Sequence, residues 1–395
     1  MKILFLLLQM PEEGRGSNMY VDLATEFARN GHDMTLMAPD NKHQSTYVRN
    51  ERGMRVIRVD SKQTQGVKNL FKKGVALATM ASHYKKAYKK HLKGEQFDWI
   101  FMPTPPITLI DFVKHIKAKT GAKFYLILRD IHPQSVQSIG LLKFKWQYNY
   151  LAKRAKSGYE IADKIGCMSQ GNIDFIASEY PELDKEKLVL LYNWLKYEPN
   201  ETEDGDIRKK YNLEGKFVAL FGGTIGLGQR IENLVSLAEH YKDNKNIVFM
   251  IIGKGVEKDR LERIAQEQNL DNIRFLNFMP QKDYLNFIKS VDLGLITINE
   301  NYKVPTCPSK AVAYMSLGVP VFAMINPNSD YGQWIEDAGA GLWTVGSDKA
   351  RTFEMFDRLY NNPDLRKQMR ENGFAYYQKH LTENAAYSEM INQMK

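Results

Sequence analysis

The sequence has few cysteines, no clustered histidines and no internal repeats. Only Cys167 and Cys307 are cysteines among 395 residues, and their separation excludes a disulfide framework and a clustered zinc site. The eight histidines never stand four residues apart, which argues against a zinc motif on a helix. This use of cysteine fits a protein of a reducing cytoplasm.

Long hydrophobic runs are also missing. The longest apolar run, residues 3–8, is far shorter than the ~20 residues that cross a bilayer. No small-residue cleavage site follows it, so we interpret it as a buried strand rather than a signal peptide. Apolar residues at 43% and charged residues at 26% exclude a disordered or collagen-like chain. At about 150 residues per domain, the length predicts two domains.

The net charge of +9 is unevenly distributed. Residues 1–195 hold 30 Lys and Arg against 19 Asp and Glu, a net of +11. Residues 196–395 hold 25 against 27, a net of −2. The asymmetry predicts two domains with different surfaces, of which the basic one faces an anionic partner.

The order of apolar runs is typical of parallel α/β sheets. A run at 2–8, a loop at 11–17, a helical pattern at 21–28 that ends before Gly31, and a run at 34–38 form a strand–loop–helix–strand unit. Further strand-like runs lie at 99–102, 123–128, 164–168 and 188–191. We expect one open α/β sheet from this half of the chain.

A polar, acidic stretch at 198–206 separates this series from a second one. Strand-like runs then recur at 217–221, 247–252, 273–277, 293–297 and 319–323. We expect two Rossmann-like domains with parallel sheets that face each other across a cleft, at 1–197 and 198–375. Residues 376–395 are expected to form a helix that packs back on the first domain. Ligands of such sheets bind at the carboxyl ends of the strands.

The glycine-rich segment Phe221–Leu234 (FGGTIGLGQRIENL) is the most informative motif. It follows a predicted strand and leads into a helical pattern. Glycines let the backbone approach a ligand closely, and a helix N-terminus offers free N–H groups to an anion. No G-x-G-x-x-G register fits, which excludes a dinucleotide fingerprint. A tight turn without a ligand is the alternative interpretation.

Two further turns carry a lysine at the end of a predicted strand or the start of a helix. Gly253-Lys254-Gly255 ends a strand, and Pro308-Ser309-Lys310 begins a helix, where a lysine opposes the helix dipole. Exposed lysines are common. These two turns and the glycine-rich segment nevertheless favour a phosphate-binding site, because all three lie in one domain at predicted strand carboxyl ends.

These motifs together resemble the nucleotide-sugar domain of family-4 glycosyltransferases, which have the GT-B fold. The similar segments are Phe221–Gly223, Ile252–Gly255, Asn277–Pro280, Asp292–Leu295, Pro308–Lys310, Tyr314–Met315, Gly318–Val321, Ala340–Leu342 and Asn362–Gly373, with Gly31–Met34 and Tyr125–Pro133 in the first half. Residues 129–133 and 308–310 are most similar to the branch that assembles bacterial surface polysaccharides. That branch includes transferases of N-acetylated deoxysugars such as L-fucosamine.

The resemblance implies retaining transfer of a sugar from a UDP-sugar to a lipid-linked saccharide in capsule or O-antigen biosynthesis. The expected sugar is an N-acetylated hexosamine or deoxyhexosamine, with no metal or other cofactor. The donor-binding residues that it implies are Gly222, Gly223, Thr224, Gln229, Arg230, Gly253, Lys254, Met279, Pro308, Ser309 and Lys310. The catalytic candidates are Arg129, Asp130 and His132, and the acceptor candidates on the loop after the first strand are Glu13, Arg15 and Gly16.

The chain departs from the family at several positions. Two glutamates that the family commonly places eight residues apart correspond to Pro305 and Ala313. The usual Arg and Lys of the glycine-rich loop correspond to Thr224 and Gln229.

We therefore assign the diphosphate to Lys310, Lys254 and Arg230, because a pyrophosphate leaving group needs fixed donors. The histidine that often precedes Asp130 in the family is Arg129 here, so His132 does not inherit that role. A packed loop histidine is the alternative interpretation of His132.

Three other interpretations stay open. Asp204-Gly205-Asp206 matches the D-x-D string of metal-dependent glycosyltransferases, although no apolar strand precedes it. A UDP-sugar 2-epimerase on the same fold should carry more carboxylates and histidines in its cleft. A catalytically inactive glycan-binding protein is consistent with Ala313.

Two basic segments suggest a surface partner. Residues 61–94 contain nine lysines and no acid, and large apolar residues are interspersed among them, including Phe71, Leu77, Met80, Tyr84 and Tyr88. Residues 143–156 are similar and include Trp146. The pattern predicts attachment to an anionic membrane, on the inner face of the cytoplasmic membrane. A nucleic acid is the rival partner, but no nucleic-acid motif supports it, and a solvated face is the third interpretation.

Overall fold

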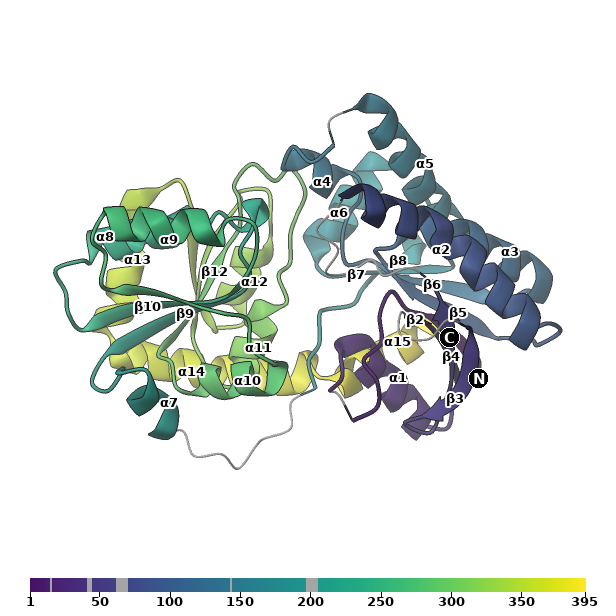
Figure 1. Ribbon diagram of the computed structural model, residues 1–395, viewed down its shortest axis with the longest axis horizontal. Coiled ribbons are helices and arrows are strands. Elements are labelled where there is room, and N and C mark those ends of the chain that lie inside the picture. Colours follow the sequence, from purple (N-terminus) through teal and green to yellow (C-terminus); the bar gives the residue numbers. More distant parts are fainter. Residues whose placement is uncertain (15, 41–44, 62–69, 143, 197–204) are drawn as a thin grey trace. The chain divides into compact units, whose positions relative to one another are not determined.

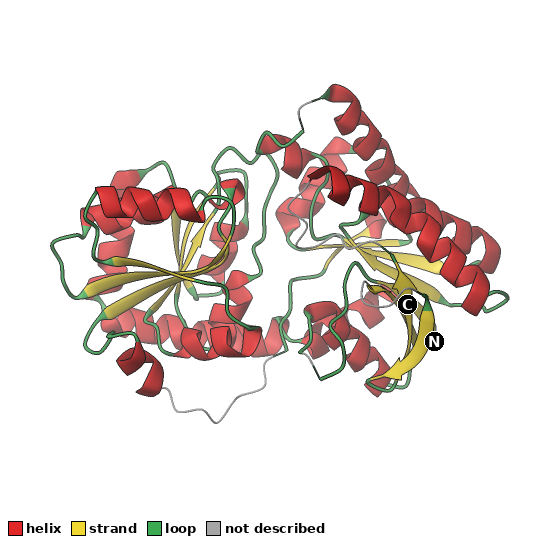
Figure 2. Ribbon diagram, in the orientation of Figure 1, coloured by secondary structure: helices red, strands yellow, loops and turns green. Residues whose placement is uncertain are grey.

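The computed structural model describes residues 1–14, 16–40, 45–61, 70–142, 144–196 and 205–395, with backbone only at 70–75, 77, 78, 205 and 206. The chain divides into two compact units. Unit 1 comprises Met1–Tyr192 together with Glu383–Lys395, and unit 2 comprises Asn193–Thr382. Each unit is built on one sheet flanked by helices (Figure 2). The domain boundaries expected from the sequence stay predictions.

Unit 1 contains an eight-stranded sheet in the order β3-β4-β2-β1-β5-β6-β7-β8. The strands are β1 (Lys2–Leu6), β2 (Asp33–Asp40), β3 (Tyr47–Glu51), β4 (Met54–Asp60), β5 (Trp99–Pro103), β6 (Lys123–Ile127), β7 (Lys164–Cys167) and β8 (Leu188–Leu190). Neighbours are parallel except β3 and β4, which form an antiparallel hairpin. The six strands predicted in this half are confirmed, whereas the hairpin was not predicted.

Helices cover both faces of this sheet. They are α1 (Met19–Arg29), α2 (Leu70–His91), α3 (Ile110–Thr120), α4 (Gln134–Ser138), α5 (Lys145–Ile161), α6 (Gln170–Glu179) and α15 (Glu383–Met394), with short turns η1 (Ile107–Leu109) and η2 (Lys185–Lys187). Helices α2, α3 and α5 lie on one side, and α1 and α15 lie on the other (Figure 1). The rings of Phe27 in α1 and Tyr387 in α15 are 4.8 Å apart. The predicted return of the C-terminal helix to the first domain is confirmed.

Unit 2 contains a six-stranded parallel sheet in the order β11-β10-β9-β12-β13-β14. The strands are β9 (Phe217–Thr224), β10 (Ile247–Lys254), β11 (Ile273–Leu276), β12 (Leu293–Thr297), β13 (Val321–Ile325) and β14 (Gly341–Val345). The five predicted strands are confirmed, and β14 adds a sixth. The predicted class of two parallel α/β sheets is therefore confirmed.

The helices of unit 2 are α7 (Gly205–Lys210), α8 (Glu232–His240), α9 (Lys258–Glu267), α10 (Gln281–Lys289), α11 (Lys310–Ser316), α12 (Tyr331–Asp337), α13 (Lys349–Asn361) and α14 (Pro363–His380), with the turn η3 (Leu227–Gln229). Figure 1 shows α8, α9 and α13 on one side of the sheet and α10, α11 and α14 on the other. The buried ring of Phe356 in α13 lies 4.9 Å from Tyr241 and 5.5 Å from Phe249. Aromatic packing thus joins α13 to the end of α8 and to β10.

The β3–β4 hairpin of unit 1 contains a buried ion pair. Glu51 is fully buried, and Arg58 is 3% exposed. The Arg58 Nε and Nη2 atoms donate to the two carboxylate oxygens of Glu51 at 2.8 and 2.6 Å. Burial alone would raise the pKa of Glu51, but the Arg58 guanidinium outweighs it and holds that pKa below its usual range.

We expect Glu51→Gln to lower the free energy of unfolding at pH 7 by about 3–5 kcal/mol, because it leaves a buried guanidinium without its charged partner. A lowered folded pKa means that Glu51 stabilises the protein fully above its unfolded pKa of about 4.3. That contribution is lost as the pH falls through the folded pKa, so the difference should shrink at pH 3. Urea denaturation at both pH values measures it.

The matched control is Glu354→Gln, which breaks the exposed Arg351–Glu354 pair on α13. It should change the free energy of unfolding by less than about 1 kcal/mol. An equally small change for Glu51→Gln at pH 7 would show that the buried pair does not stabilise the hairpin.

Candidate functional site

The carboxyl ends of β9 and β10 approach each other closely. Gly253 of β10 lies beside Gly223 of β9 in the parallel register. A Cβ atom on Gly253 would lie 1.8 Å from the Gly223 carbonyl oxygen, and one on Gly222 would lie 2.0 Å from the Tyr284 hydroxyl. Only glycine permits this approach. The structure therefore brings two of the predicted glycine turns together.

Lys310, the first residue of α11, lies against this glycine backbone. Its Nζ atom is 5.0 Å from the centre of the Phe221 ring. A Cβ atom on Gly223 would be 2.9 Å from Lys310 Cε. Within the described residues no carboxylate pairs with Lys310, and burial lowers the pKa of its ammonium to about 8. A cation so placed is suited to an anionic ligand.

Lys254 lies at the end of β10, beside the loop that follows β11. Its Nζ atom is 4.5 Å from the centre of the Phe278 ring, and the Phe278 side chain is 61% exposed. Lys258 Nζ donates to Asn277 Oδ1 at 2.6 Å and joins the start of α9 to the loop after β11. Met279, another predicted donor residue, follows Phe278 and is half-buried.

The loop between β9 and α8 carries Thr224, Gln229 and Arg230. Thr224 ends β9 and is exposed, and Gln229 ends η3. Arg230 adopts a left-handed conformation with φ of 48°, and its Nη2 atom lies 3.4 Å from Glu300 Oε1. Arg230 is therefore paired with a carboxylate that sequence reasoning did not single out.

The turn before α11 is anchored by residues that sequence reasoning missed. The Pro308 carbonyl accepts a hydrogen bond from the Tyr331 hydroxyl, and exposed Ser309 directly precedes the helix. The buried Tyr314 hydroxyl donates to the Leu220 carbonyl of β9 at 2.9 Å. The sequence signal for Tyr314 was its place in the family motif, which gave it no role.

The turn after β6 in unit 1 holds the three catalytic candidates. Arg129 is buried, and its Nη1 atom donates to the Leu191 carbonyl at 2.8 Å. His132 Nε2 lies 4.0 Å from Asp130 Oδ2, and His132 Nδ1 lies 3.2 Å from the Ser135 hydroxyl. The structure thus brings Asp130 and His132 together, whereas the Arg129 guanidinium donates a hydrogen bond to the backbone at Leu191.

The surroundings of this turn shift the pKa values of Asp130 and His132. Desolvation raises the pKa of Asp130 to about 6 and lowers that of His132 to about 4. The Asp130 side chain is 55% exposed, so a ligand can reach it. At pH 7 the turn therefore carries an ionised Asp130 and a neutral His132.

The loop after β1 contains the acceptor candidates. Glu13 Oε1 accepts a hydrogen bond from the Arg52 backbone N–H at 2.9 Å. Gly16 has φ of 91°, and its carbonyl accepts from Arg52 Nη2 at 2.9 Å. Arg15 lies outside the described residues. The polar turn around Arg52 and Gly53 could have predicted a hairpin, but not its contact with this loop.

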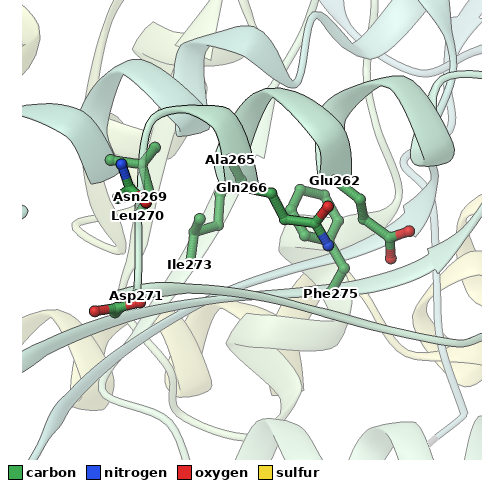
Figure 3. Close-up of a pocket in the computed structure, with 8 residues that line it drawn as sticks. All are labelled: Glu262, Ala265, Gln266, Asn269, Leu270, Asp271, Ile273 and Phe275. Carbon is green, nitrogen blue, oxygen red and sulfur yellow. The ribbon is translucent and has the colours of Figure 1, made fainter.

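A cavity of about 430 Å³ lies elsewhere in unit 2, between α9 and the edge strand β11 (Figure 3). Its lining residues are Glu262, Ala265, Gln266, Asn269, Leu270, Asp271, Ile273 and Phe275. None of them is a predicted site residue. The cavity lies along the outer edge of the sheet and not at the loops that carry Lys254 and Lys310.

The D-x-D string has no described carboxylate pair. Asp204 lies outside the described residues, and Asp206 belongs to α7. Across the described parts of the chain, no three His, Cys, Asp or Glu side chains are grouped to hold a metal ion. No described helix is both long and apolar enough to cross a membrane.

The structure corrects part of the interpretation of residues 61–94. Met80, Tyr84 and Tyr88 are buried, and the Tyr84 hydroxyl donates to the Leu7 carbonyl at 2.6 Å. These side chains belong to the core and are not membrane anchors. Residues 62–69 and the side chains of Phe71 and Leu77 lie outside the described residues.

Two groups of side chains in the basic segments are exposed to solvent. Lys85, Lys86, Lys89 and Lys90 of α2 are exposed. Around the start of α5, large apolar side chains are exposed, namely Leu141 (54%), Phe144 (58%), Trp146 (68%) and Tyr150 (47%). Residue 143 lies outside the described residues.

Known proteins resemble this chain in sequence. Residues 203–376 match the family described as Glycosyl transferases group 1. WbjE of Pseudomonas aeruginosa, named as a glycosyltransferase, is 24% identical over 266 residues, which are 66% of this chain and 66% of WbjE. WcaI of Escherichia coli K12, named as a colanic acid biosynthesis glycosyl transferase, is 24% identical over 226 residues, or 55% and 54%. Each match spans less than two thirds of the relative's length.

Solved structures resemble the chain over nearly its whole length. Sucrose-phosphate synthase of Thermosynechococcus elongatus has a TM-score of 0.74 at 16% identity, covering 99% of this chain and 97% of that one. Anabaena HepE in complex with UDP-glucose has a TM-score of 0.68 at 14% identity, covering 99% of both. The chain therefore has the GT-B fold, and its residues 203–376 are similar to the family described as Glycosyl transferases group 1.

Proposed function

We propose that this protein is a retaining glycosyltransferase that moves a sugar from a UDP-sugar to a lipid-linked saccharide in bacterial surface polysaccharide biosynthesis. The expected donor sugar is an N-acetylated hexosamine or deoxyhexosamine. The observation that carries the proposal is the ammonium of Lys310 beside the glycine backbone of β9, without a carboxylate partner in the described residues. HepE, solved with UDP-glucose, and WcaI, named for colanic acid biosynthesis, support it.

The donor diphosphate lies, in this proposal, over the ends of β9 and β10. Lys310 and Lys254 offset its negative charge, and the backbone at Gly223 and Gly253 lets it approach closely. Negative charge grows on the leaving UDP, and fixed cations stabilise that charge in the transition state. Arg230 contributes once the ligand competes with Glu300 for its guanidinium. No metal is required by these steps.

The turn after β6 acts on the sugar. Ionised Asp130 stabilises the positive charge that develops on the sugar ring as the bond to UDP breaks. Neutral His132 offers a hydrogen bond to a sugar hydroxyl. Arg129 holds the turn against the Leu191 carbonyl, and the loop with Glu13 and Gly16 receives the acceptor saccharide.

The lipid-linked acceptor places the enzyme at a membrane. We propose that unit 1 binds the inner face of the cytoplasmic membrane through its exposed lysines on α2 and its exposed apolar residues from Leu141 to Tyr150. Lysines are drawn to anionic headgroups, and aromatic side chains insert at headgroup depth.

UDP binding tests the donor site. Lys310→Ala should weaken UDP binding about tenfold or more, because a hydrogen bond to a charged group contributes roughly 1.5–3 kcal/mol. The pKa of about 8 also predicts that affinity begins to fall between pH 7 and 8 and falls further above pH 8, as the ammonium loses its proton. The terminal phosphate ionises near pH 6, below this range. Calorimetric titration in EDTA measures both effects.

The control is Lys242→Ala, which removes an exposed lysine between α8 and β10. It should leave the affinity and its pH dependence unchanged. Unaltered UDP affinity in Lys310→Ala would remove Lys310 from the donor site, and binding that vanishes in EDTA would require a metal.

The pH dependence of donor turnover tests the turn after β6. As Asp130 ionises with a pKa of about 6, kcat/KM should rise about tenfold between pH 5 and 7. His132 is neutral throughout that range. Asp130→Asn should lower kcat/KM by about 10²–10⁴ and abolish the rise. UDP release from the preferred UDP-sugar is the assay.

Asp111→Asn serves as the control, because Asp111 is an exposed carboxylate paired with Arg154 on another part of unit 1. Its profile should match the wild type. If the rise near pH 6 persists in Asp130→Asn, another group is responsible for it.

Sedimentation with anionic vesicles tests the membrane surface. Each lysine near such a surface contributes about 1 kcal/mol, so replacing Lys85, Lys86, Lys89 and Lys90 with Gln should weaken binding strongly. The combined Phe144→Ser and Trp146→Ser variant should also weaken it. Binding should fade at high salt, since the Debye length falls from ~10 Å at 0.1 M to ~3 Å at 1 M.

Phe374→Ser is the matched control, since Phe374 is a 39% exposed aromatic residue on α14 of unit 2. It should sediment like the wild type. Wild-type protein that stays in the supernatant at low salt would make the lysines a solvated face and would leave the donor site unaffected.

A further inference from the structure

Arg52 of the β3–β4 hairpin donates hydrogen bonds to the loop that connects β1 to α1. Arg52 Nη1 donates to the Pro11 carbonyl at 3.4 Å, and Nη2 donates to the carbonyls of Glu12 at 3.1 Å and Gly16 at 2.9 Å. The Arg52 backbone N–H donates to Glu13 Oε1 at 2.9 Å. One residue thus bonds four residues of this loop.

A second arginine, Arg58, donates hydrogen bonds to the first part of the same loop. Arg58 Nη1 and Nη2 donate to the carbonyls of Met10 at 2.7 Å and Pro11 at 3.2 Å. The bidentate pair with buried Glu51 sets the orientation of the Arg58 guanidinium. Arg52 lies at the hairpin tip with φ of 54°, so the hairpin turn carries its side chain to the loop.

The described residues at the tip of this loop are exposed and include two glycines. Met10 is buried, but Glu13, Gly14 and Gly16 are exposed, and the two glycines have φ of 80° and 91°. Exposed glycine-rich backbone samples many conformations unless it is bonded. Charge-assisted hydrogen bonds to the carbonyl oxygens restrict it, and the Arg52 backbone N–H also holds the Glu13 carboxylate.

We propose that Arg52 is a positioning residue of the acceptor site. It holds the loop that bears Glu13 and Gly16 in the conformation that receives the hydroxyl groups of a saccharide. This inference rests on the proposed function, because that function assigns the loop to the acceptor. Loss of the hydrogen bonds from Arg52 to the loop should therefore weaken binding of the acceptor and leave binding of the donor unchanged.

The test compares Arg52→Asn with the wild-type protein. Asparagine tolerates the left-handed backbone at the hairpin tip but is too short to reach the loop carbonyls. Hydrogen exchange of residues 9–18 should be about tenfold faster in the variant. In transfer from a UDP-sugar to lipid-linked saccharides, KM for the acceptor should rise about tenfold, with kcat and UDP affinity unchanged.

Two further variants complete the test. Arg49→Asn removes an exposed arginine of β3 that approaches Glu51 at 3.6 Å, and it should behave like the wild type. Arg52→Lys keeps the charge without the planar fork and should restore part of the protection and part of the acceptor affinity.

Each outcome decides the inference. Unchanged exchange of residues 9–18 in Arg52→Asn would show that Arg52 does not hold the loop. Faster exchange with an unchanged acceptor KM would show that the loop does not position the acceptor. A wild-type protein that neither binds UDP nor releases it from any UDP-sugar would instead overturn the proposed function. The hydrogen-exchange result would still show whether Arg52 restricts the loop.

Discussion

The candidate donor end of unit 2 depends on the close approach of the ends of β9 and β10, which is possible only because Gly253 and Gly255 have no Cβ atom. A Cβ atom on Gly253 would lie 1.8 Å from the Gly223 carbonyl oxygen, and one on Gly255 would lie 1.9 Å from the Ile225 carbonyl oxygen. The Ile225 N–H donates to the Lys254 carbonyl at 3.0 Å, so pairing continues past the strands. A methyl group at either glycine would force the loops apart. The position of Lys254 follows from this contact.

The position of helix α11 also depends on a glycine that leaves room for a neighbouring side chain. A Cβ atom on Gly294 would lie 2.5 Å from the Tyr314 ring, so glycine makes room for that ring, and the Tyr314 hydroxyl then reaches the Leu220 carbonyl of β9. This anchor sets Lys310 at the start of the helix against the Phe221 ring. Burial works against the charge of Lys310, and an anion bound there would offset that cost.

In unit 1 the organising interactions are those of arginine with backbone carbonyls. Arg58 satisfies the Glu51 carboxylate and two loop carbonyls at once, which a lysine ammonium could not do with the same planar fork. Arg129 uses the same chemistry to join the turn after β6 to the Leu191 carbonyl. Rigid guanidinium contacts therefore set the backbone of both loops that the proposed reaction would use, while Asp130 stays accessible to a ligand.

The sequence by itself determined where the central strands lie along the chain, because each is a short apolar run bounded by turn residues, and the glycine and lysine turns followed from local chemistry. It missed residues 47–51 and 341–345, because β3 is a mostly exposed edge strand and β14 begins at a glycine. It also missed residues 54–60, because Arg55 and Arg58 interrupt the apolar pattern of the largely buried strand β4. An apolar helix face looks the same whether it meets a sheet or a membrane, so only the tertiary structure decided that Tyr84 is core. The partners of Arg52 were also decided there, because a backbone carbonyl has no signature in the sequence.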